Sequence, residues 1–107
     1  MNNLQVSLAQ LVNKAQAAAG QPQRLTLRRG LRVDVLITGD KTMLQISRVD
    51  VQPSERELKI VLRDWPGTVP ASAAASVKRT YYAGRHYLTM RWITPPPQRE
   101  LFEEIGG

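Results

Sequence analysis

The segment from Trp65 to Arg99 contains no acidic residue, and its predicted hairpin, residues 77–93, mixes basic with aromatic side chains. The basic residues are Lys78, Arg79, Arg85 and Arg91, and the aromatic residues are Tyr81, Tyr82, Tyr87 and Trp92. Cations bind successive phosphates, and flat rings stack on unpaired bases. This combination is therefore typical of a surface that binds nucleic acid. Because the rings need unpaired bases, we expect single strands to be favoured.

The turn of this hairpin decides which of these side chains share a face. Ala83-Gly84 suits a two-residue turn, because glycine adopts a positive φ without strain. Strand residues alternate between faces, so this turn places on one face Lys78, Thr80, Tyr82, Arg85, Tyr87, Thr89 and Arg91. On that face we predict phosphate contacts from Lys78, Arg85 and Arg91 and base stacking from Tyr82 and Tyr87. The alternative is an ordinary solvated strand face.

A second basic region lies near the start of the chain. Residues 1–33 carry a charge of +5 without an acidic residue, in a chain whose net charge is +6. Within this region Leu27 and Leu31 must share a face, which requires a three-residue loop, Arg28–Gly30, with Gly30 in the left-handed region. Arg28 and Arg29 would then lie at an exposed hairpin tip and could extend the basic surface.

The hydrophobic pattern predicts one helix and several strands. Residues 4–19 place apolar side chains at spacings of three and four, which indicates an amphipathic helix that ends near Gly20. Strands follow at residues 31–37 and 44–51. A four-residue turn at residues 39–42 would set Ile37 opposite Leu44, and a bulge near Ser47-Arg48 would explain a change in the apolar alternation.

Two later segments complete the expected fold. Leu58, Ile60 and Leu62 alternate with polar residues and predict a strand after a turn at residues 53–56, whereas residues 68–76 fit a short helix or a loop. The expected fold class is α+β. An N-terminal amphipathic helix packs on a twisted, mostly antiparallel β-meander of about six strands, which could curl into a half-barrel. Either outer strand could pair with a second copy and make a homodimer.

We expect a single domain over residues 1–94 and a C-terminal tail over residues 95–107, which begins with three prolines. In the tail, Gln98, Leu101 and Phe102 lie at the first, fourth and fifth positions of a five-residue segment. This segment resembles the short motif with which many bacterial DNA-metabolism proteins dock on the replicative sliding clamp. The resemblance implies a protein partner for the tail, and the alternative is that Leu101 and Phe102 pack on the domain itself.

Catalytic and metal-binding interpretations find little support in the sequence. Asp50 and the segment Glu57-Leu58-Lys59 resemble the acidic and basic core of a metal-dependent nuclease family, but the spacing is compressed and a solvated surface is the ordinary interpretation. His86 is the only histidine, and the chain has no cysteine to complete a metal site with it. We therefore expect no catalytic residue, metal or cofactor.

The composition is that of a soluble protein that works in the cytoplasm without a membrane partner, since no apolar run approaches the length of a membrane span. The function expected from the sequence is that of a small, non-enzymatic accessory protein that binds nucleic acid. The alternative is a protein-interaction module, an adaptor or an assembly subunit of a larger complex, whose contacts are the uncharged face of the N-terminal helix and the tail.

Overall fold

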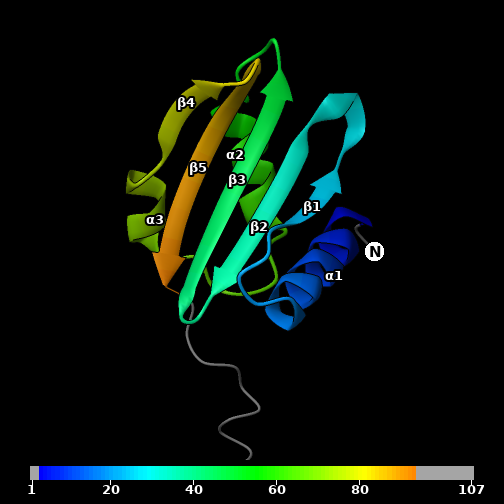
Figure 1. Cartoon of the computed structure of the whole chain (residues 1–107), viewed down its shortest axis with the longest axis vertical. Helices are drawn as coiled ribbons and strands as arrows, with labels where there is room; N and C mark the ends of the chain where they lie inside the picture. The colour runs from blue at the N-terminus through cyan, green and yellow to red at the C-terminus, as the bar shows by residue number, and fades with distance from the viewer. Residues whose placement is uncertain (1–2, 94–107) are drawn as a thin grey trace, which may run out of the picture.

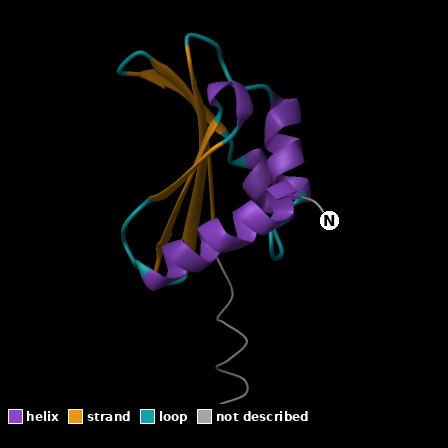
Figure 2. Ribbon diagram, turned by 90° about the vertical axis from the view of Figure 1, so that its right-hand side faces the viewer, coloured by secondary structure: helices purple, strands orange, loops and turns teal. Residues whose placement is uncertain are grey.

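The computed structural model describes residues 3–93 as an α+β fold in two layers, a five-stranded antiparallel sheet and three helices that lie on one side of it (Figure 2). In chain order the elements are α1 (Asn3–Ala17), β1 (Gln23–Thr26), the short 3-10 turn η1 (Arg28–Gly30), β2 (Arg32–Thr38), β3 (Lys41–Val49), α2 (Glu55–Arg63), α3 (Ala71–Ala75), β4 (Lys78–Tyr82) and β5 (Arg85–Ile93).

The strands lie in the order β1-β2-β3-β5-β4, and the chain passes behind the sheet through α2 and α3 before it returns as the β4–β5 hairpin (Figure 1). This crossover makes β3 the neighbour of β5. The sheet is not closed into a barrel, and its five strands compare with the expectation of about six. No helix among residues 3–93 is long and apolar enough to span a membrane.

The core lies between the sheet and the helices. Alternate residues of β2, β3 and β5 are buried there, among them Val33, Val35, Leu44, Ile46, Leu88, Met90 and Trp92. Helix α1 contributes Leu8, Leu11 and Ala15, as its apolar spacing predicted. Trp65, just after α2, meets Trp92 of β5 edge to face, with ring centroids 5.7 Å apart. One face of the sheet is therefore closed by helices, and within residues 3–93 no helix covers the other, which we call the uncovered face (Figure 2).

The two hairpin turns predicted from face alternation are confirmed. Leu27 donates its N–H to the Leu31 carbonyl at 2.7 Å across the three-residue loop, in which Gly30 has a φ of 74°. At the other hairpin Tyr82 lies directly across from Arg85, which leaves Ala83 and Gly84 as a two-residue turn with φ values of 52° and 76°. Both loops need positive φ, and glycine supplies it at the last position of each turn at little cost.

The strand predicted around Leu58, Ile60 and Leu62 is wrong, because this segment is helix α2. Ser54 and Glu57 form a capping box: the Ser54 side chain accepts from the Glu57 N–H at 3.1 Å, and Glu57 accepts from the Ser54 N–H at 3.0 Å. These bonds satisfy the amide groups that begin the helix. The residues that face the sheet are Leu58 and Val61, whereas Ile60 lies toward the solvent.

Two details predicted for β3 are also wrong. The turn between β2 and β3 holds two residues, Gly39 and Asp40, because Thr38 lies across from Lys41, and Ile37 therefore faces Thr42. No bulge interrupts β3 near Ser47, since its register with β5 continues from Lys41 to Val49. The apolar alternation changes because Val49 belongs to the uncovered face, where it is half exposed.

The ambiguous segment 68–76 contains the short helix α3, whose Ala73 is buried in the core. The segment 94–107, with the tail residues Gln98, Leu101 and Phe102, lies outside the described residues. The domain boundary at residue 94 therefore stays a prediction.

Candidate nucleic-acid interface

The uncovered face of the sheet carries the basic and aromatic residues predicted for the last hairpin. In an antiparallel ladder, residues directly across from each other point to the same face. Lys78 lies across from Thr89, Thr80 across from Tyr87, and Tyr82 across from Arg85. On β5, the residues between these positions are buried against the helices, namely Leu88, Met90 and Trp92. The hairpin thus places on the uncovered face Lys78, Tyr82, Arg85, Tyr87 and Arg91.

Tyr82 and Tyr87 differ in how they lie on this face. Tyr82 is 73% exposed, so its ring is available for stacking. Tyr87 is half-buried and lies across from Ser47 of β3. Ser47 is only 1% exposed although no helix covers it, because its two cross-strand neighbours, Tyr87 and Arg32, have long side chains. Tyr81 belongs to the other face, where its ring lies 4.5 Å from that of His86.

Arg85 has an unusual guanidinium group. Its Nη1 is buried, yet it has no hydrogen-bond partner among the described residues. A buried donor without an acceptor costs free energy, and a phosphate oxygen is the kind of acceptor that a guanidinium binds best. Arg85 lies between Tyr82 on one side and Val49 on the other, so an anion bound there would have an aromatic and an aliphatic neighbour.

Arg28 and Arg29 lie at the same end of the sheet as the Ala83-Gly84 turn. Thr26 and Arg32, which flank this loop, lie across from each other. Arg32 in turn lies across from Ser47 of β3, and Ser47 lies across from Tyr87, near the start of β5 and the turn. Both residues are exposed, and the carbonyl of Arg29 accepts a hydrogen bond from Nη1 of Arg48. The structure brings them to the end of the basic face, two strands away from the last hairpin.

Three further cations on the uncovered face were not predicted from the sequence: Arg24 of β1, Arg32 of β2 and Lys41 of β3. The register assigns them to this face, since Arg24 lies across from Asp34 and Lys41 across from Ile93. The sequence pattern that indicates their position is alternation. Each is followed directly by a residue that points to the core side, namely Leu25, Val33 or Thr42, so the cation itself points to the uncovered face. Among residues 3–93, six cations thus gather on the uncovered face.

One acidic residue, Asp34, lies on the same face and is paired with Arg24. The Nε of Arg24 donates to a carboxylate oxygen of Asp34 at 2.8 Å. This hydrogen bond and the charge of Asp34 raise the pKa of Arg24, with a smaller contribution from Tyr87. Arg24 is therefore already neutralised in part, and the other five cations give the face its positive charge.

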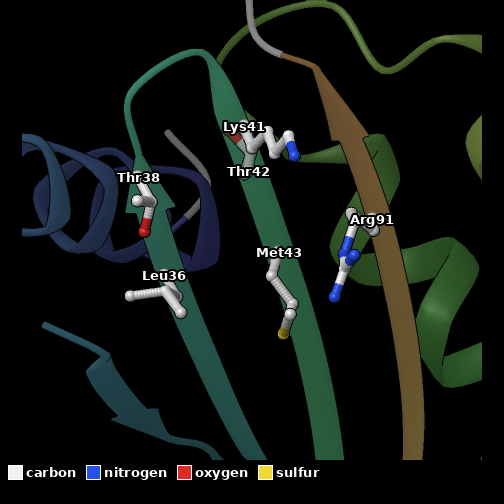
Figure 3. Close-up of a pocket in the computed structure, with 6 residues that line it drawn as sticks. All are labelled: Leu36, Thr38, Lys41, Thr42, Met43 and Arg91. Carbon is white, nitrogen blue, oxygen red and sulfur yellow. The ribbon is translucent and has the colours of Figure 1, made fainter. Parts of the chain in front are cut away.

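A hollow of about 250 Å³ opens on this face at the end opposite to the Ala83-Gly84 turn. Its lining residues are Leu36, Thr38, Lys41, Thr42, Met43 and Arg91. Figure 3 shows Lys41 and Met43 extending from β3, with the guanidinium of Arg91 beside them on β5. Leu36 and Met43 lie directly across from each other and supply an apolar floor, whereas Lys41 and Arg91 supply two positive charges. Such a site suits a ligand that is flat and apolar on one side and anionic on the other.

The residues of the nuclease-like pattern do not converge. Asp50 is exposed and follows β3, whereas the Glu57 carboxylate accepts from Nε of Arg48 at 3.1 Å and from the Ser54 amide. Hydrogen bonding by Arg48 is the main reason that the pKa of Glu57 is lowered. Within residues 3–93 no three His, Cys, Asp or Glu side chains gather as metal ligands would, and the ring of His86 lies against that of Tyr81 at an angle of 46°.

No protein-family model matches the chain, and comparison with curated proteins and with solved structures gave no similar protein.

Proposed function

We propose that this protein binds single-stranded nucleic acid on the uncovered face of its sheet, as a non-enzymatic accessory protein. The observation that supports the proposal best is the gathering of six cations and two tyrosines, from five strands, on a face that no helix of the described residues covers. Cations in rows across a sheet meet a phosphate backbone, and exposed rings accept bases whatever their identity.

Each part of the face has a role in this proposal. Lys78, Arg85 and Arg91 bind phosphates along the last hairpin, and Arg28 with Arg29 extend the contact at one end. Tyr82 and Tyr87 stack on bases. The hollow beside Met43 accepts one unpaired base, while Lys41 and Arg91 hold the phosphate next to it. The expected location is the cytoplasm.

Fluorescence-anisotropy titration tests the proposal, with labelled single-stranded and double-stranded oligonucleotides at two salt concentrations. We expect tighter binding to the single strand, and a dissociation constant that rises more than about tenfold between about 50 and 200 mM salt if three or more phosphates are bound. Failure to bind either oligonucleotide at the lower salt concentration contradicts the proposal.

A second function, that of a protein-interaction module, has one observation in its favour. The exposed face of α1 carries a single charge, Lys14, among the uncharged residues Gln5, Gln10, Asn13 and Gln16. A partner docked there, or on the tail residues Gln98, Leu101 and Phe102, would bind with little dependence on salt. Binding of a protein partner that persists at high salt, without any affinity for oligonucleotides, would favour this function.

A further inference from the structure

The outer strand β4 leaves one edge of the sheet open. It pairs with β5 on one side, and among the described residues no strand pairs with its other side (Figure 1). All five of its residues are exposed. The opposite edge of the sheet differs, because α1 packs against β1 there. An open edge presents unpaired backbone donors and acceptors to another strand.

The turn of the hairpin determines which backbone groups point outward. In a hairpin with a two-residue turn, the residues that flank the turn, Tyr82 and Arg85, form a hydrogen-bonded pair. Such pairs alternate along the ladder, so Lys78, Thr80 and Tyr82 direct their N–H and C=O groups toward β5. Arg79 and Tyr81 therefore direct theirs outward, away from the sheet.

The sequence of β4, Lys78-Arg79-Thr80-Tyr81-Tyr82, is complementary to itself when a copy runs antiparallel to it. With Thr80 at the centre, Lys78 lies across from Tyr82 of the second copy and Arg79 across from Tyr81 of the second copy. Each pair sets a cation beside an aromatic ring, which is attractive although Arg79 also binds the Glu55 carboxylate of its own chain, and a threonine pair at the centre is favourable too. The two outward residues are then the ones that exchange backbone hydrogen bonds.

We propose that β4 pairs with β4 of a second copy of this chain, antiparallel and centred on Thr80. The four outward N–H groups of Arg79 and Tyr81 in the two copies donate to the four outward carbonyls. The two-fold axis is perpendicular to the sheet, so both uncovered faces lie on the same side of one continuous sheet. The cations and tyrosines of the two hairpins then form a single surface of twice the area.

Sedimentation equilibrium of the full chain without nucleic acid, over a range of concentrations, tests the pairing through Tyr81→Pro. Of the backbone groups, proline removes only an outward N–H there, and it is tolerated on an edge strand, so the β4–β5 ladder remains. We expect a dimer for the wild type and a monomer for the variant, with the same circular dichroism spectrum. A wild type that is monomeric at about 1 mM, or a folded variant that still dimerises, would overturn the proposal.

Tyr81→Glu and Tyr81→Lys make the test independent of the proline variant. Both remove the ring and its contact with His86, so they share any effect on folding. Both are made in a Glu55→Gln background, because the Glu55 carboxylate otherwise binds Arg79. In that background glutamate would lie across from Arg79 of the second copy and attract it, whereas lysine would repel it. Because each such pair occurs twice in the dimer, we expect the dissociation constant of the dimer to be about tenfold higher for the lysine variant.

The same two substitutions at Gln10, which is exposed on α1, are the control for net charge. Gln10→Glu and Gln10→Lys are expected to give equal dimer dissociation constants. If the Tyr81 pair also gives equal constants, or the opposite order, β4 is not the interface. Because no oligonucleotide is present, this result is independent of whether the protein binds nucleic acid.

Discussion

Arg48 binds Glu57 across the covered side of the sheet, with its Nε 3.1 Å from one carboxylate oxygen. The same guanidinium donates through Nη1 to the Arg29 carbonyl. Glu57 also belongs to the capping box that begins α2, through Ser54. This pair therefore connects the end of β3, the start of α2 and the loop that carries Arg28 and Arg29.

Glu57→Gln is expected to lower the free energy of unfolding at pH 7 by about 1–2 kcal/mol, because a half-buried charged hydrogen bond is lost. The folded state lowers the pKa of Glu57 from its ordinary value of 4.5, chiefly through Arg48. Its stabilisation is thus present above pH 4.5 and is lost as the pH falls through the lowered pKa. Urea unfolding at pH 7 and near pH 3 measures this, and an equal difference at both pH values would contradict it.

Gly30→Val is expected to destabilise the fold by about 1–2 kcal/mol. Gly30 has a φ of 74° with no atom near its missing Cβ, so the cost comes from the backbone and not from a clash. Thermal unfolding measures it, with Thr26→Val as a control because Thr26 is an exposed strand residue where a β-branched side chain is favourable. Unchanged stability in Gly30→Val would show that the left-handed conformation is not required.

Converting Lys78, Arg85 and Arg91 together to glutamine is expected to reduce the slope of log affinity against log salt by about two for a single strand. Each lost phosphate contact removes about 0.7 of a released counterion. Anisotropy titrations at several salt concentrations give the slope. The matched control is the conversion to glutamine of Lys14, Arg56 and Lys59, which are exposed on α1 and α2. It removes the same number of positive charges from the helical layer. A control that loses as much slope would show that only net charge matters.

Tyr82→Ala and Tyr87→Ala are each expected to weaken single-strand binding by about 1–3 kcal/mol without a change in salt slope, because a lost stacking contact releases no counterion. His86→Ala is the natural comparison, since His86 belongs to the same hairpin but lies on the covered side of the sheet. Should His86→Ala weaken binding more than the other two, the bases would lie elsewhere.

Met43→Ala is expected to weaken binding of a single-stranded oligonucleotide about fivefold, because the base in the hollow loses part of its apolar floor. The affinity for an abasic strand of the same length is expected to stay the same, since Lys41 and Arg91 still bind its phosphate. Anisotropy with both strands makes the comparison. An equal loss for the two strands would indicate that the substitution disturbs the sheet and that the hollow holds no base.

The sequence alone determined the two hairpin turns and the face that carries Lys78, Tyr82, Arg85, Tyr87 and Arg91. Turn geometry is local, and the strict alternation of strand side chains carries it along the hairpin. For α2, two local patterns competed. Leu58, Ile60 and Leu62 alternate as a strand does, whereas Leu58, Val61 and Leu62 follow the helical spacing. The capping box of Ser54 and Glu57 was the signal that favoured the helix.

The tertiary structure decided how far the basic face extends. Arg32 and Lys41 join the last hairpin only because α2 and α3 return the chain so that β5 lies beside β3. The hollow depends on the same pairing, since Arg91 of β5 lies across from Met43. The contacts between β3 and β5, which lie far apart in the sequence, follow from the packing of the helices on one face of the sheet. No local propensity specifies them, because the free energy that selects the strand order comes from burying apolar surface along the whole chain.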